Sequence, residues 1–207
     1  MTWRLEAAGH VAIKGRFWRM LAPRWAFNPL SGAGAARAGG RWNAPGQAAL
    51  YLSDSHATAI AEYQQALPRP GTLTGYDVDA QDVLDLSDPA VRHAVELDEP
   101  FLRQPWKEVR DILHQRPPCW DFALAAAASG WHGLRVPSVQ AQGVNLVLWA
   151  WNQPGTPRVR HVDPLGDLPR DQASWLGAEQ PGTGQVGAES QAAWDLARRT
   201  HTLVRSK

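Results

Sequence analysis

Apolar and polar positions alternate along several stretches of the chain, and this alternation predicts β-strands. The clearest stretch runs from His10 to Leu21, where apolar side chains stand among basic ones. A short apolar run at 48–52 predicts a buried strand that precedes the first long helix. Further strands are predicted at 71–78, 131–136, 144–151 and 158–162.

Apolar positions at helical spacing predict helices between these strands. Ser55 is a typical helix N-cap, and the helical face that begins at Ala57 ends before Pro68. Gly130 suits the end of a buried helix. The other predicted helices are Pro89–Glu96, Phe101–His114, Trp120–Ala128 and a short one at 171–176.

Two stretches lack such a pattern. Residues 22–47 predict a long loop rich in Gly, Pro and Ala, and a loop of this length in a compact domain is usually functional. Residues 177–187 predict a linker, and residues 188–207 a C-terminal amphipathic helix. The pattern therefore predicts an α+β fold in one domain, residues 1–176, with a helical tail that leaves self-association as a homodimer open.

Composition narrows the class of protein. A chain of 207 residues with 44% hydrophobic residues suits one globular domain, and the 11 Trp are expected mainly in packing. The lone Cys119 excludes an internal disulfide and suits a reducing cytoplasm. The start of the chain lacks the apolar core of a signal peptide, and the longest apolar runs are too short to span a membrane. We therefore expect a cytoplasmic protein without membrane contact.

The charge is uneven along the chain. The net charge is +1, yet the first 46 residues carry seven basic side chains against Glu6 alone. A basic segment in a nearly neutral protein favours a small anionic ligand over nucleic acid, which usually needs a broader positive surface. The histidines and Cys119 show no metal-ligand spacing, so we expect no metal.

The strongest candidate site lies in the run from Gly39 to Gly46, which contains Arg41 between glycines and Trp42. Tyr51 follows in the predicted strand and Glu62 in the next helix. A guanidinium, an aromatic ring and a carboxylate suit a phosphorylated, ribose-bearing ligand whose bond to the sugar is cut. By itself Arg41 could also be a surface residue paired with an acid, Tyr51 a core residue and Glu62 a partner of an arginine.

A second candidate group lies at a predicted turn. Ser138 follows Pro137 at the end of a strand, and Asn145 lies in an apolar strand where it must find hydrogen-bond partners. Taken alone, Ser138 is more often an ordinary turn serine. Asn145 could pin a turn instead of touching a substrate.

Together these motifs resemble the RES domain, a family named for its arginine, glutamate and serine. The resemblance rests on Gly-Gly-Arg-Trp-Asn-x-Pro-Gly, Leu-Tyr-Leu, Ala-x-Ala-Glu and a later Val-Pro-Ser, and it spans about 17–175. It implies a fold similar to ADP-ribosyltransferases, NAD⁺ as substrate and no other cofactor. It also implies a toxin of a bacterial toxin–antitoxin pair, whose partner is a helix-turn-helix antitoxin.

The resemblance assigns roles to individual residues. Arg41, Glu62 and Ser138 match the three residues that name the family, and Tyr51 matches an aromatic residue between the first two. Arg19 resembles an earlier substrate-facing arginine. Arg24 competes with Arg19 for that role, and Asn145 joins Ser138 among the expected binding residues.

We therefore expect cleavage of the bond between nicotinamide and ribose, with water or phosphate as the acceptor. Glu62 would stabilise the oxocarbenium-like ribose, Arg41 and Arg19 would clamp the pyrophosphate, and Ser138 would bond a phosphate or ribose oxygen. Three alternatives remain open: ADP-ribosylation of a protein, a non-catalytic nucleotide-binding or antitoxin-binding module, and a toxin that targets RNA.

Overall fold

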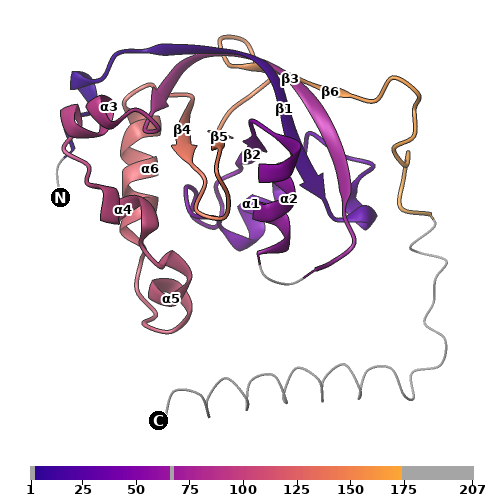
Figure 1. Ribbon diagram of the computed structural model, residues 1–207, viewed down its shortest axis with the longest axis horizontal. Helices are drawn as coiled ribbons and strands as arrows, with labels where there is room; N and C mark the ends of the chain where they lie inside the picture. Colours follow the sequence, from indigo (N-terminus) through magenta and orange to yellow (C-terminus); the bar gives the residue numbers. More distant parts are fainter. Residues whose placement is uncertain (1–2, 66–67, 174–207) are drawn as a thin grey trace. The chain divides into compact units, whose positions relative to one another are not determined.

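The computed structural model describes residues 3–65 and 68–173, and the fold below is built from these residues (Figure 1). The predicted linker at 177–187 and tail helix at 188–207 lie outside the described residues, as does most of the helix predicted at 171–176. In the described part of the chain, no helix is long and apolar enough to cross a membrane.

Six strands form the centre of the fold, in the order β1-β2-β5-β4-β3-β6. β1 also pairs with β3, so the first five strands close into a ring, while β6 lies on the outer edge of β3. The β3–β4 pair is parallel and the other pairs are antiparallel. The strands are β1 (Val11–Leu21), β2 (Leu50–Ser53), β3 (Thr72–Asp85), β4 (Gly133–Pro137), β5 (Val144–Leu148) and β6 (Arg158–Val162).

The period-two pattern of the strands divides the apolar side chains between two cores. On β2, Leu50 and Leu52 face a core shared with β1, β3, β5 and β6, whereas Tyr51 packs against the other core. On β5, Leu148 and Val147 divide in the same way. The expected mixture of a strand core with surrounding helices is therefore confirmed.

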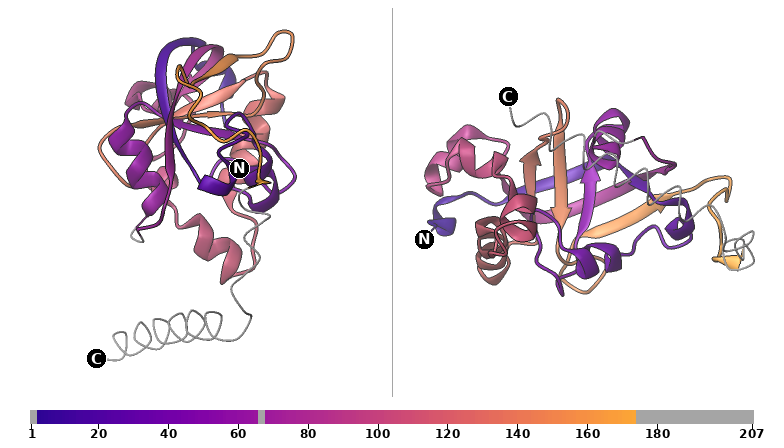
Figure 2. Two further views of the ribbon diagram at one scale, coloured as in Figure 1. Left: turned by 90° about the vertical axis from the view of Figure 1, so that its right-hand side faces the viewer. Right: turned by 90° about the horizontal axis from the view of Figure 1, so that it is seen from below.

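The second core lies between the strands and the helices α3, α4 and α6, which contribute side chains such as Val91, Phe101 and Phe122. α2 packs instead on β1 and β2. Figures 1 and 2 show α6 and α2 on opposite sides of the strands. The helices are α1 (Ala33–Ala38), α2 (His56–Gln64), α3 (Pro89–Ala94), α4 (Glu99–Arg103), α5 (Trp106–Asp111) and α6 (Pro118–Ala128), with 3₁₀ turns at Leu5–Ala7 (η1) and Pro23–Trp25 (η2).

The helix predicted at Phe101–His114 is wrong as a single element, because it divides into α4 and α5. Pro105 explains the break. Proline lacks an N–H and disfavours helical backbone in the residue before it, and Gln104 is accordingly extended, with φ −50° and ψ 136°. The break lets α5 leave the direction of α4 and form one wall of the site described below.

Two other predictions need correction. The strand predicted at 71–78 continues to Asp85. Ala80 and Val83 both lie in the core, because an extra residue between them, where Asp82 has φ 55°, forms a bulge that shifts the alternation. The loop predicted at 22–47 contains η2 and the short helix α1. α1 spans only six residues, too few to show a helical period in the sequence.

Ser55 is confirmed as the N-cap of α2, since its Oγ accepts the Thr58 N–H at 3.1 Å.

Candidate active site

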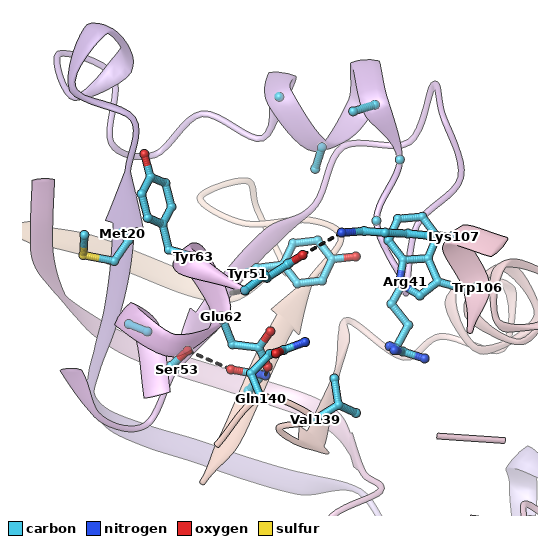
Figure 3. A pocket seen from close by; sticks show the side chains of 18 of the residues that line it. Met20, Arg41, Tyr51, Ser53, Glu62, Tyr63, Trp106, Lys107, Val139 and Gln140 are labelled. Carbon is cyan, nitrogen blue, oxygen red and sulfur yellow. Dashed lines mark hydrogen bonds between the residues drawn. The ribbon is translucent and has the colours of Figure 1, made fainter. Parts of the chain in front are cut away.

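A cavity of about 710 Å³ opens beside α2 and brings most of the predicted site residues together. Its wall includes Arg19, Arg41, Tyr51, Glu62 and Asn145. Figure 3 shows Glu62 on one side of the cavity and Arg41 with α5 on the other. Residues far apart in the sequence thus face one space, of a size typical for small-molecule sites.

Arg41 lies at the tip of a tight turn. The Gly40 N–H donates to the Asn43 carbonyl at 2.9 Å, which closes the turn. The buried Asn43 side chain donates to the carbonyls of Ala35 at 2.9 Å and Gln47 at 2.8 Å. Asn43 thereby ties the turn to α1 and to the loop that follows it.

Aromatic side chains hold the same turn from below. The Trp120 indole donates to the Gly40 carbonyl at 2.7 Å, and the Trp149 indole to the Trp42 carbonyl at 2.8 Å. The Tyr51 hydroxyl accepts the Trp42 N–H at 3.0 Å and donates to Asn43 Oδ1 at 2.8 Å. A Cβ at residue 40 would lie 2.4 Å from that hydroxyl, so only glycine fits there.

The Arg41 guanidinium lies in the cavity wall and donates to the Gln104 carbonyl at 2.7 Å. Burial lowers the pKa of Arg41 from its usual value, while nearby Cys119 and Glu62 oppose this shift. Among the described residues Arg41 has no carboxylate in salt-bridge contact, so it is not a surface arginine paired with an acid. Burial raises the pKa of Tyr51, whose hydroxyl stays neutral and bound to the turn.

Glu62 lies on the face of α2 that carries the buried Ala59 one turn earlier, and both residues line the cavity. Its Oε1 accepts the Ser138 hydroxyl at 2.7 Å and the Asn145 amide at 2.7 Å. Neither partner is an arginine, so the carboxylate is oriented by neutral donors. Its second oxygen has no hydrogen-bond partner among the described residues and is free to meet a ligand.

Ser138 and Asn145 are fixed in turn by their surroundings. Ser138 Oγ accepts the N–H groups of Gln140 and Ala141, each at 3.1 Å, so its hydroxyl points its proton at Glu62. Ser138 is buried behind Glu62 and is not part of the cavity wall. Asn145 lies opposite Ser53 in the β2–β5 pair, and the Ser53 hydroxyl donates to Asn145 Oδ1 at 2.7 Å.

The two candidate N-terminal arginines have different positions. Arg19 ends in the cavity wall, where its Nη1 donates to the carbonyls of Pro29 at 3.2 Å and Ser31 at 3.1 Å. Burial lowers the pKa of Arg19 from its usual value. Arg24 lies exposed on η2 and does not line this cavity.

The sequence analysis missed the wall formed by α5. Trp106 and Lys107 line the cavity, and Arg110 lies 4.9 Å from the centre of the Trp106 ring. Arg69 also lines it and stacks 4.0 Å above the Tyr63 ring. The basic residues Lys107 and Arg110, one helical turn apart, were the available signal.

This arrangement can bind a compact anion beside a sugar. The guanidinium groups of Arg19 and Arg41 supply donors for phosphate. The Glu62 carboxylate, which has one oxygen without a hydrogen bond among the described residues, lines the same cavity. Among the described residues, no group of three His, Cys, Asp or Glu side chains could hold a metal ion.

These features define the class of protein. Residues 16–171 match the RES domain, and the chain belongs to the RES domain family. Among individual proteins, it is 33% identical over 137 residues to NAD(+) phosphorylase MbcT of Mycobacterium tuberculosis and of Mycobacterium bovis, a match that covers 60% of this chain and 67% of each relative.

A solved structure is similar as well. One chain in the crystal structure of the M. tuberculosis MbcT–MbcA toxin–antitoxin complex is 28% identical to this chain, with a TM-score of 0.54. The match covers 77% of this chain and 89% of that chain.

Proposed function

We propose that this chain is the toxin of a bacterial toxin–antitoxin pair and that it degrades NAD⁺ at the bond between nicotinamide and ribose. One observation carries the proposal: Glu62 is held through a single oxygen, and it faces the guanidinium groups of Arg19 and Arg41. Within the described residues neither arginine has a carboxylate partner. An anionic ligand supplies the missing charge.

The chemistry follows from the carboxylate. When the C1′–N1 bond breaks, its electron pair leaves with nicotinamide, which departs neutral, and positive charge develops on the ribose. The free oxygen of Glu62 stabilises that charge electrostatically. Because the other oxygen accepts two hydrogen bonds, the carboxylate does not have to reorient during the reaction.

The arginines bind the charged part of the substrate. Arg41 and Arg19 contact the pyrophosphate, since guanidinium groups bind phosphate oxygens in pairs. Tyr51 offers its ring to the nicotinamide or its ribose, because its hydroxyl is occupied by the turn. Ser138 contributes mainly by holding Glu62, with any bond to a ribose or phosphate oxygen as a secondary role.

Inorganic phosphate is the acceptor that we favour, because the relatives at 33% identity are NAD(+) phosphorylases. Its oxygen attacks C1′ and forms ADP-ribose 1-phosphate, with nicotinamide as the other product. NAD⁺ is the substrate, and the reaction as drawn needs no further cofactor. We also propose that the fold is similar to that of ADP-ribosyltransferases, as the resemblance to the RES domain implies. A protein acceptor is therefore the alternative outcome of the assay below.

We also propose a proteinaceous antitoxin, of the helix-turn-helix type, as the partner. The similar chain with 28% identity was solved in a toxin–antitoxin complex, which supports a partner of this kind. Co-expression of this chain with a candidate helix-turn-helix antitoxin, followed by co-purification of the two chains, would test this part.

The deciding assay follows NAD⁺ loss by purified protein with and without phosphate, with the products separated by chromatography. Glu62→Gln keeps the shape and removes the charge, so kcat should fall at least about 100-fold. Glu108→Gln is the matched control, because Glu108 is an exposed carboxylate on the same cavity wall. Equal activity of Glu62→Gln and wild type would contradict the mechanism.

Arg41→Ala tests the binding role. It should raise the KM for NAD⁺ about 10- to 100-fold, because it removes a buried charged hydrogen-bond donor. Arg158→Ala, an exposed arginine on β6 outside the cavity, is its control. An unchanged KM would exclude Arg41 from the pyrophosphate site.

A further inference from the structure

A second cavity, of about 380 Å³, adjoins the first one at the end of β1. Both cavities are lined by Arg19, Met20 and Gly34, so they meet at these residues. A Cβ built on Gly34 would find no atom within 4 Å, so no described side chain fills the space beside this shared residue. A ligand longer than the first cavity can therefore extend into the second.

The second cavity differs in character from the first. Its wall includes the rings of Trp25 and Phe27, whose centroids lie 6.3 Å apart, together with the polar Asn28 and Ser31. Trp25 is 46% exposed, which is unusual for so large an apolar side chain. Aromatic surface with a few polar groups suits a flat heterocyclic base.

The charged side chains are distributed unevenly between the two cavities. Arg19 stands at the junction, and its direction is fixed by the Pro29 and Ser31 carbonyls that it contacts. Arg37, at the end of α1, lines the second cavity and forms no ion pair with any residue of the described ranges. Glu62 lines the first cavity only.

We infer that the second cavity is the subsite for the adenine end of the dinucleotide. The aromatic rings of Trp25 and Phe27 and the guanidinium of Arg37 line the second cavity, Arg19 lines both cavities, and Arg41 and Glu62 line the first. This distribution matches a base, a pyrophosphate and a ribose in turn. The inference rests on the proposed function, because the place of Glu62 assigns the nicotinamide end to the first cavity.

The first test measures binding without chemistry. ADP is the probe, since it carries the base and the diphosphate but lacks the nicotinamide–ribose bond that is cut. Calorimetry gives its Kd. Trp25→Ala should weaken ADP binding about 10-fold, the effect of losing one base–aromatic stack. Glu62→Gln is the control and should leave the Kd for ADP within about two-fold of wild type.

A second variant fills the cavity instead of emptying it. Gly34→Leu projects a side chain into the open junction and removes a glycine from a helix, so the fold should be retained or slightly stabilised. ADP binding should nevertheless fall at least about 10-fold. Gly9→Leu is the control, because a Cβ at Gly9 also meets no atom within 4 Å and Gly9 is not among the glycines with positive φ.

Substrate length gives an independent readout. With wild type, kcat/KM for NAD⁺ should exceed that for nicotinamide mononucleotide, which lacks the adenylate. Trp25→Ala should reduce this preference about 10-fold. The subsite would be overturned if Trp25→Ala kept the full preference for NAD⁺ over nicotinamide mononucleotide. It would also be overturned if neither Trp25→Ala nor Gly34→Leu changed the Kd for ADP. Loss of the proposed function would look different: ADP would still bind through Trp25, while no NAD⁺ would be consumed.

Discussion

The two sides of the first cavity are built in different ways. Arg41 is held by its own neighbourhood in the chain, because Gly40, Trp42 and Asn43 fold the turn that carries it. Glu62 is held by side chains that lie 76 and 83 positions further along, Ser138 and Asn145. One side is a local turn that packs on buried aromatic side chains, and the other is a polar network between residues far apart in the sequence.

This difference explains what each side contributes. The backbone and side chains next to Arg41 are used for packing and hydrogen bonds within the turn, which leaves the Arg41 side chain to face a ligand. The network uses neutral donors, so the Glu62 carboxylate is oriented without being neutralised by a cation. Substitutions in the residues that hold the turn should therefore act mainly on stability, whereas those in the network around Glu62 should act mainly on catalysis.

The largest effect is expected from Asn43→Ala. Asn43 is fully buried, and its loss removes one hydrogen bond from the Ala35 carbonyl and leaves the Gln47 carbonyl and the proton of the Tyr51 hydroxyl without a partner. The free energy of unfolding should fall by about 3 kcal/mol, because each unsatisfied buried group costs roughly 1–3 kcal/mol. Urea unfolding measures the change. A loss below about 0.5 kcal/mol would show that the aromatic contacts alone hold the turn.

The next effect is a loss of stability at high pH on the Arg41 side. Burial raises the pKa of the Cys119 thiol from 9.0 to about 11. The folded state then binds the proton more tightly than the unfolded chain, so this contribution is complete below pH 9 and is lost as the pH rises towards 11. It amounts to about 2.7 kcal/mol at most, since each pKa unit corresponds to about 1.36 kcal/mol. Cys119→Ala should flatten the decline in unfolding free energy over that range, and parallel curves would contradict the assignment.

The smallest effect tests the network on the Glu62 side. Ser53→Ala removes the hydroxyl that fixes the Asn145 amide, so kcat should fall about five- to ten-fold with KM unchanged. Combining it with Asn145→Ala should add little, because both changes break one chain of hydrogen bonds. Additive losses in the double variant would show that Ser53 does not act through Asn145.

The sequence predicted part of the fold well and part poorly, for identifiable reasons. β1 and the N-cap of α2 were predictable, because alternation and the Ser55 hydroxyl act within a few residues. The division of 101–114 into two helices was missed, because the apolar positions keep helical spacing across Pro105 although the proline ends the first helix. The α5 wall was missed with it, since its place depends on where the chain turns.

By itself, the sequence determined the turn that presents Arg41, the helix that carries Glu62 and the family to which the chain belongs. The turn and the helix depend on short-range spacing, and the family on short motifs in a fixed order along the chain. Only the tertiary structure decided that Ser138 and Asn145 orient Glu62, that α5 closes the cavity and that a second cavity opens at Gly34. These features require strands β2, β4 and β5 to lie side by side and α1 to meet the end of β1. Such contacts join distant parts of the chain, so no local pattern encodes them.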